Sequence, residues 1–175
     1  MRLFIALYPD KASLKNIAHM RDAYQANAEG KFVEDKQLHL TLNFLGDIES
    51  GQLESLKNIV NALPATPFTL AMKPSVFKVR KGQILALEAF HDSNLIKLRK
   101  DLVDTIAGIG IQPDRRTFKP HITLARRYKA DHEKEKDDAS EPETITVTFD
   151  RIVLVRSILK SHGATHQFQA TKLLK

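Results

Sequence analysis

Apolar residues recur along the chain with helical and strand periods in turn. Residues 2–8 form a nearly continuous apolar run, the pattern of a buried strand, and Pro9 ends it. Apolar positions at helical spacing predict three helices, at about 11–28, 50–62 and 93–108. Alternating or short continuous apolar stretches predict further strands at about 38–45, 67–80, 83–90, 120–127, 145–149, 152–159 and 166–173. Strands and helices mixed in this way indicate an α+β domain.

One segment departs from this pattern. Residues 129–143 carry many charges and almost no apolar side chain. A segment of that composition cannot bury enough apolar surface to pack against a core. We therefore expect it to be a mobile surface loop.

A four-residue phrase occurs twice, as His39-Leu40-Thr41-Leu42 and as His121-Ile122-Thr123-Leu124. In a strand, alternate side chains lie on one face, so each histidine shares a face with its threonine while the aliphatic pair shares the other. Strict alternation also places Asn43 beside the first His–Thr pair, and places Phe44 and Arg126 on the packed faces. Each phrase is thus predicted to line a cleft with an imidazole and a hydroxyl.

The repeat extends beyond these phrases. Leu3 opens a strand, a helix follows, and His39 comes 36 positions after Leu3; Leu85 and His121 have the same separation around a second helix. This matched arrangement predicts a duplicated strand–helix–strand unit with pseudo-two-fold symmetry. Such symmetry would bring both histidines to one central groove.

Two imidazoles in one groove can divide the work of acid–base catalysis. A neutral imidazole accepts a proton near pH 7 and a protonated one donates it, so the pair could drive displacement at phosphorus without a metal. The hydroxyls of Thr41 and Thr123 could hydrogen-bond the non-bridging phosphate oxygens. The alternatives are histidines satisfied by neighbours in the fold, and a metal site. Two histidines with no nearby carboxylate or cysteine make a poor ligand set, so no metal is expected.

Composition limits the partners, the kinds of site and the cellular location that the chain can have. The chain has 175 residues, with 27 Lys and Arg against 21 Asp and Glu, giving a formal net charge of +6. This balance suits a polyanionic partner such as RNA. The absence of cysteine excludes disulfides, thiolate metal sites and a cysteine nucleophile. No apolar run reaches the about 18 residues of a membrane span, and the N-terminus lacks a signal-peptide pattern, so we expect a cytoplasmic protein.

The two phrases and their flanks, Leu38–Gly46 and Phe118–Arg126, resemble the two signatures of the 2H phosphoesterase superfamily. The branch that the chain resembles most is that of the bacterial and archaeal RNA 2′,3′-cyclic phosphodiesterases, the LigT-like proteins also described as 2′-5′ RNA ligases. The opening run from Met1 to Leu7 and the closing segment from Ile152 are also typical of that branch. The resemblance covers essentially the whole chain.

This resemblance implies a single bilobal α+β domain over residues 1–175, with two antiparallel sheets flanking a central cleft. It implies hydrolysis of an RNA 2′,3′-cyclic phosphate end to a 2′-phosphomonoester without metal or cofactor, together with reversible 2′-5′ RNA ligation. His39 would be the proton donor and His121 the proton acceptor. Thr41 and Thr123 would hold the phosphate. Arg126 matches the arginine that often ends the second motif, although alternation places Arg127 rather than Arg126 toward the cleft.

Aromatic residues near strand ends suggest a place for a nucleobase. Phe118 and Tyr8 are expected to stack a base, whereas Phe4 and Phe44 are assigned to the core. The other histidines are given surface or structural roles: His19, His91, His132, His162 and His166.

The chain is expected to be a monomer. Two further functions stay open. One is a 2H-type phosphodiesterase acting on another cyclic or 2′-5′-linked nucleotide, and the other is a non-catalytic RNA-end binding protein.

Overall fold

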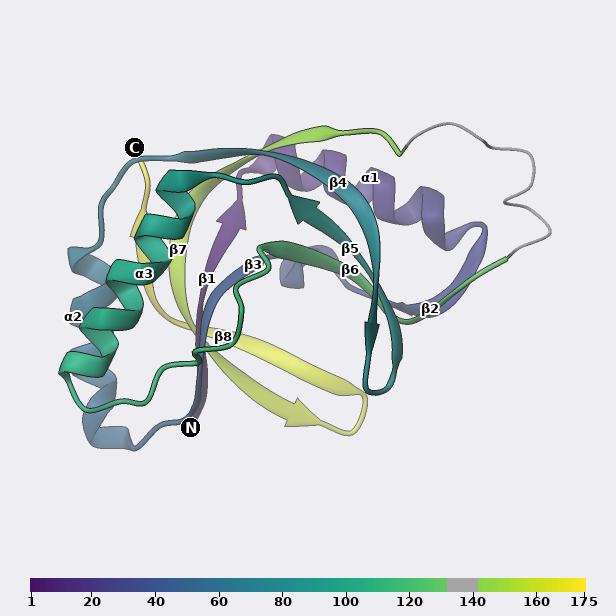
Figure 1. Cartoon of the computed structure of the whole chain (residues 1–175). Helices are drawn as coiled ribbons and strands as arrows, with labels where there is room; N and C mark the ends of the chain where they lie inside the picture. Colours follow the sequence, from purple (N-terminus) through teal and green to yellow (C-terminus); the bar gives the residue numbers. More distant parts are fainter. Residues whose placement is uncertain (132–141) are drawn as a thin grey trace.

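A computed structural model of the chain describes residues 1–131 and 142–175 (Figure 1). The helices and strands of these residues follow one another as β1 (Arg2–Pro9), α1 (Lys11–Gln25), β2 (Ala28–Phe32), β3 (Leu40–Asp47), α2 (Leu53–Ala62), β4 (Phe68–Val79), β5 (Gly82–Ala89), α3 (Ser93–Gly108), β6 (His121–Ala130), β7 (Ile145–Lys160) and β8 (Gly163–Leu173). Short 3-10 turns, η1 (Asp35–Gln37) and η2 (Ser50–Gln52), precede β3 and α2.

The strands of the described residues pair antiparallel throughout, in the order β1-β3-β6-β5-β4-β7-β8, with β2 added beside β6. β1 also pairs with β7, so the order from β1 through β3, β6, β5 and β4 to β7 returns to β1. The 16-residue β7 closes this ring because its first part pairs with β4 and its later part pairs with β1 and β8. The expected α+β class with antiparallel strands is confirmed. The two expected sheets are joined, along β7 and at a single bridge between Leu40 and Ile122.

β1 is buried on both faces, as its continuous apolar run predicts. One face packs into the main core through Leu3, Ile5 and Leu7. The opposite face forms a second apolar cluster, made of Phe4, Ala6, Tyr8, Val153 and Val155. This second cluster carries the aromatic rings that meet the first histidine motif.

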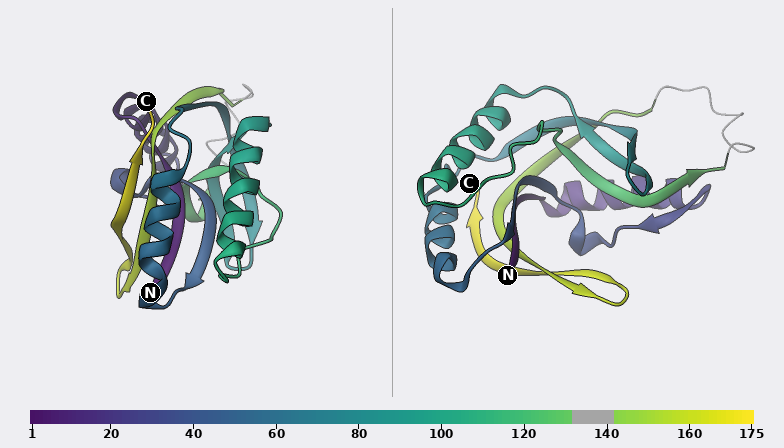
Figure 2. Two further views of the ribbon diagram at one scale, coloured as in Figure 1. Left: turned by 90° about the vertical axis from the view of Figure 1, so that its left-hand side faces the viewer. Right: turned by 60° about the horizontal axis from the view of Figure 1, so that its bottom comes forward.

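The three predicted helices are present and cover the main core. The side chain of Asp10 caps α1 by accepting a hydrogen bond from the backbone N–H of Ser13 at 2.7 Å, and Asp92 caps α3 in the same way through Leu95 at 2.8 Å. α2 and α3 lie side by side, as both views of Figure 2 show. The helical residues buried in the core are Ile17, Leu56, Val60, Leu95, Leu98, Leu102 and Ile106.

Several predicted boundaries differ from the structure. The first helix ends at Gln25 instead of residue 28, because Ala28–Phe32 forms β2 against β6. The strands expected at 145–149 and 152–159 are one strand, β7, because pairing with β4 and then with β1 and β8 continues without a break. The start of the predicted loop, Lys129 and Ala130, belongs to β6. The part of that loop at 132–141 lies outside the described residues.

The pairing of β1 with β3 and that of β5 with β6 are alike in register, and both contain a one-residue irregularity at the same position of the motif. Ile5 and Ala6 pair with Asn43 and Thr41, which leaves Leu42 as an extra residue in β3. Leu85 and Ala86 likewise pair with Ala125 and Thr123, which leaves Leu124 extra in β6. A β-bulge therefore stands at the last residue of both phrases.

The bridge between Leu40 and Ile122 joins equivalent positions of the two phrases. A local two-fold axis therefore passes between these two residues. The register also corrects the spacing argument, because the partner of Leu85 in the duplication is Ile5 and not Leu3. The equal separation of 36 residues from Leu3 and Leu85 is thus a coincidence of sequence.

Candidate active site

Both histidines are held by the backbone in the same way. Nδ1 of His39, which lies just before β3, is 2.6 Å from the carbonyl oxygen of Gln37. Nδ1 of His121, the first residue of β6, is 2.7 Å from the carbonyl oxygen of Lys119. A carbonyl oxygen can only accept, so each Nδ1 carries the hydrogen and the neutral ring leaves Nε2 unprotonated. Each imidazole thus presents Nε2 as the atom that can take or give a proton.

His39 lies in an aromatic setting. The rings of Phe4 and Tyr8 stack on it, with centroids 5.0 and 5.5 Å away, and the ring of His166 meets it edge to face at 5.3 Å. Its Nε2 is 3.2 Å from Oγ1 of Thr41, which donates to it in the neutral state. Burial lowers the pKa of His39 to about 4, against the opposing effect of the Gln37 hydrogen bond. At neutral pH, without ligand, His39 is therefore uncharged.

The two motifs meet across the Leu40–Ile122 bridge. The bridged residues Leu40 and Ile122 are buried, whereas the histidine and threonine that flank each of them are only partly buried, so the two His–Thr pairs lie on the opposite face from the core. Besides burial, the charges of His166, Arg126 and His121 contribute to lowering the pKa of His39, which requires these groups to be near its ring. The structure thus gathers both histidines and both threonines on one side of these strands.

The paired bulges reverse the side-chain alternation just beyond each phrase, since one extra residue turns the side chains that follow it to the opposite face. The expectation that Phe44 packs in the core is wrong: its side chain is 47% exposed and lies 6.0 Å from the ring of Phe4. Asn43, expected to face the cleft, is instead buried, and its side-chain oxygen accepts a hydrogen bond from the backbone N–H of Asp114.

The same reversal carries Arg126 to the side of His121. Its charge lowers the pKa of both His39 and His166, and desolvation lowers the pKa of its own guanidinium. Placement of Arg126 on the packed face is therefore wrong. Both arginines are exposed, and Arg127 has a left-handed backbone with φ of 52°. Of the two arginines, Arg126 is the one whose charge acts on the histidines.

Phe4 is buried as expected, whereas Phe118 and Tyr8, expected to stack a base, are packed against other side chains. Phe118 packs partly into the core beneath the guanidinium of Arg99, at 4.9 Å from its ring centroid. Tyr8 is buried against His39, and Phe168 meets Tyr8 at 4.9 Å. The ring of Phe77 lies 5.5 Å from His121. Phe77, His166 and Phe168 were not identified from the sequence, because β4 and β8 reach the motifs only through long-range strand pairing.

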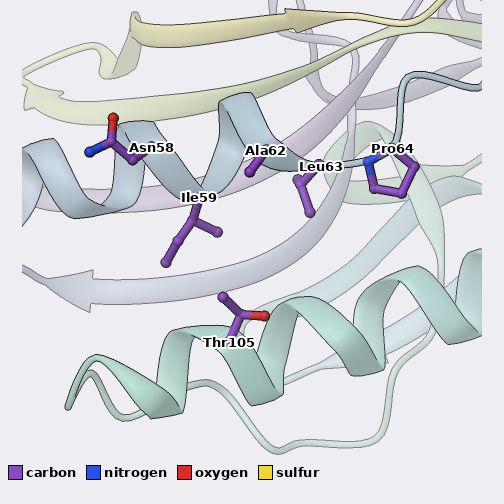
Figure 3. Close-up of a pocket in the computed structure, with 6 residues that line it drawn as sticks. All are labelled: Asn58, Ile59, Ala62, Leu63, Pro64 and Thr105. Atoms are coloured by element: carbon purple, nitrogen blue, oxygen red, sulfur yellow. The ribbon is translucent and has the colours of Figure 1, made fainter.

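Other features of the described structure do not add to this chemistry. Among residues 1–131 and 142–175, no three side chains of His, Cys, Asp or Glu are grouped so that they could hold a metal ion. No helix in those residues is long and apolar enough to cross a membrane. A pocket between α2 and α3 is lined by Asn58, Ile59, Ala62, Leu63, Pro64 and Thr105, none of which belongs to the histidine motifs (Figure 3).

Solved structures share this architecture. A Thermus thermophilus protein, TT0787, superposes with a TM-score of 0.78 at 23% identity, over 99% of this chain and 98% of that one. Escherichia coli LigT without ligand superposes with a TM-score of 0.76 at 22% identity, over 99% of this chain and 97% of that one. At these identities the likeness establishes the fold.

Sequence relatives point the same way. A protein named RNA 2′,3′-cyclic phosphodiesterase from Aquifex aeolicus is 28% identical over 172 residues, 93% of this chain and 92% of that protein. One of the same name from Geobacillus stearothermophilus is 32% identical over 104 residues, 57% of this chain, but the match spans only 33% of that longer protein. The model of the 2′-5′ RNA ligase superfamily matches residues 8–159, which include both histidine phrases. The chain therefore belongs to the 2′-5′ RNA ligase superfamily.

Proposed function

We propose that this protein hydrolyses 2′,3′-cyclic phosphate ends of RNA to 2′-phosphomonoesters, with His39 and His121 exchanging the protons. The observation that carries the proposal is the bridge between Leu40 and Ile122, which brings two equally oriented imidazoles to one side of a joined pair of strands. The name shared by the Aquifex and Geobacillus relatives supports the choice of substrate. The net charge of +6 suits an RNA end.

In the proposed reaction, Nε2 of His121 takes a proton from water as the water oxygen attacks phosphorus. The bond from phosphorus to the 3′ oxygen breaks, and Nε2 of His39 protonates that leaving oxygen. The product keeps its phosphate on the 2′ oxygen. If an RNA 5′-hydroxyl attacks in place of water, the same steps form a 2′-5′ linkage, so reversible ligation belongs to the same proposal.

The low pKa of His39 sets a condition on its role as proton donor. The ligand-free ring is neutral at pH 7, because burial holds its pKa at about 4. A bound phosphate is an anion, and an anion in contact with an imidazole favours the protonated ring. His39 therefore gains its proton as the substrate binds and passes it to the leaving oxygen. In this proposal the hydroxyls of Thr41 and Thr123 hydrogen-bond the phosphate oxygens.

The proposal predicts turnover without a metal. Incubation with an oligonucleotide ending in a 2′,3′-cyclic phosphate, in excess EDTA, should convert it fully to a 2′-phosphate, because both proton transfers use imidazoles. The product is read by mass spectrometry and by resistance to a 3′-specific phosphatase. Loss of activity in EDTA that zinc or magnesium restores would contradict the metal-free mechanism. Tight binding of the oligonucleotide with no turnover would instead identify an RNA-end binding protein.

Arg126 is proposed to hold the phosphate through its guanidinium. Arg126→Gln should lower kcat/KM by about 10- to 100-fold, since one charge-assisted hydrogen bond contributes about 1.5–3 kcal/mol. Its neighbour provides a matched control: Arg127→Gln removes the same charge one residue away and should leave kcat/KM within about twofold of the wild type. Equal losses in both variants would mean that the overall charge, and not a contact of Arg126, attracts the substrate.

A further inference from the structure

The hairpin of β7 and β8 is tied to the segment that precedes the first histidine. It projects from the sheet at the lower right of Figure 1 and comes forward in the right-hand view of Figure 2. Nζ of Lys31 donates to the carbonyl oxygen of His162 at 2.8 Å. Nε2 of Gln37 donates to the carbonyl oxygen of Ala164 at 2.6 Å. Two side chains, one from β2 and one from η1, thus hold the far end of this hairpin.

His166 follows Ala164 on the same face of β8, two residues along. Its ring meets His39 at 5.3 Å and Phe4 at 5.1 Å, at interplanar angles of 73° and 71°. Among the described residues, no hydrogen-bond partner lies at its buried Nδ1, so the contacts of His166 with these two rings are made by ring packing.

His39 and the β7–β8 hairpin are connected through Gln37. The backbone carbonyl of Gln37 accepts a hydrogen bond from Nδ1–H of His39, and its side chain donates one to the carbonyl oxygen of Ala164 on β8. The ring of His166, also on β8, packs against the ring of His39. Gln37 therefore fixes both the hydrogen bond that orients the imidazole and the hairpin that packs against it. Together these contacts restrict rotation of the His39 ring.

We propose that His166 and Gln37 are positioning residues, which hold the β7–β8 hairpin against His39 and keep its Nε2 directed at the reacting phosphate. This inference rests on the proposed function for its kinetic consequences, but its structural part concerns the free protein. A proton donor displaced by about 1 Å can lose two orders of magnitude in rate, so a ring held on several sides contributes to turnover without touching the substrate.

The hairpin also limits the access of water to His39. The charged or titratable groups near this ring come from three strands: Tyr8 on β1, His121 and Arg126 on β6, and His166 on β8. None of these four groups is a carboxylate that would stabilise a protonated His39 in the free protein at neutral pH. Opening the hairpin would hydrate the ring and so move the pKa of His39 from about 4 toward its ordinary value.

Two substitutions at position 166 test the proposal. His166→Ala should lower kcat about tenfold with KM within about twofold, because it releases the ring without removing a substrate contact. His166→Phe keeps an aromatic edge but cannot carry a proton, and it should recover most of the lost kcat. Gln167→Ala, an exposed neighbour on β8, serves as the matched control and should retain wild-type kcat. If His166→Phe is as impaired as His166→Ala, His166 acts through its own nitrogen and the positioning role is overturned.

NMR titration of the His39 imidazole provides a readout that needs no substrate. His166→Ala and Gln37→Ala should each raise the pKa of His39 above that of the wild type. His166→Phe should raise it less than His166→Ala, because both changes remove the charge of His166 and only the change to alanine also opens the hairpin. The exposed Lys36→Ala should leave it unchanged. An unchanged pKa and Nδ1–H tautomer in both His166→Ala and Gln37→Ala would overturn the inference. If wild-type protein fails to open the cyclic phosphate, the proposed function is wrong, and the titration still decides whether these residues position His39.

Discussion

His39→Ala and His121→Ala variants should each turn over a 2′,3′-cyclic-phosphate oligonucleotide about 100-fold or more slowly than the wild type, the scale of general acid–base catalysis. Each change removes the Nε2 that exchanges a proton with the reacting oxygens. Thr41→Ala and Thr123→Ala should cost less, about tenfold, because each removes a single hydrogen bond to the phosphate. Single-turnover rates with saturating enzyme measure these losses, and urea unfolding shows whether each variant remains folded.

A substrate whose leaving group needs no proton separates the two roles. With a nitrophenyl phosphodiester, the departing nitrophenolate is stable as an anion, so the proton donor becomes dispensable while activation of water does not. The His39→Ala variant should then approach the wild-type rate, and the His121→Ala variant should stay impaired. Recovery of the His121 variant alone would reverse the assignment of donor and acceptor. Recovery of both would show that neither imidazole activates water.

The elements nearest the site were predictable where the decisive interactions are local. The buried strand at β1 and the amphipathic helices follow from apolar spacing. The two histidine phrases follow from a repeated pattern of neighbouring residues. The hydrogen bonds from each histidine to the backbone carbonyl two residues before it, in Gln37 and Lys119, are also local. They could not be predicted, because the side chains of these two residues take no part in them.

The predictions from sequence are wrong where the structure depends on pairing between strands and not on neighbouring residues. Alternation predicted the wrong faces for Phe44 and Arg126, because a bulge depends on the register with β1 or β5 and not on the residues of the bulged strand alone. β2 was missed because Ala28–Phe32 lacks strand periodicity and is held by its pairing with β6. Gly30 supports that pairing: an added Cβ would come within 3.2 Å of the carbonyl oxygen of Arg126.

His166 illustrates the same limit at the site itself. Its neighbours in sequence are a turn and a polar strand, which predict an exposed residue. Its contacts with Phe4 and His39 arise only because β8 folds back along β7, and β7 lies beside β1. Alternation could show that His166 and Phe168 share a face of β8, but only the pairing identifies that face as the one beside His39.

The partly buried imidazole of His39 should make the protein lose stability as the pH falls. Its pKa is about 4 in the folded protein and near 6.5 in the unfolded chain, so between these values the unfolded state binds a proton that the folded state does not. The free energy of unfolding therefore rises with pH across this window. The contribution of His39 to it is fully present above about pH 6.5. Lowering the pH from 7 to 4.5 should cost about 2 kcal/mol through this one ring.

Urea unfolding of wild type and His39→Gln at pH 7 and pH 4.5 isolates this contribution. Carboxylates also titrate in this range, so the informative quantity is the difference between the two proteins' losses of unfolding free energy. His39→Gln should lose about 2 kcal/mol less than the wild type, since glutamine has no proton to bind. His19→Gln on α1 removes an exposed histidine and should lose as much as the wild type. Equal losses in wild type and His39→Gln would mean that His39 is hydrated in the folded protein, which would also remove the reason for its proton uptake on substrate binding.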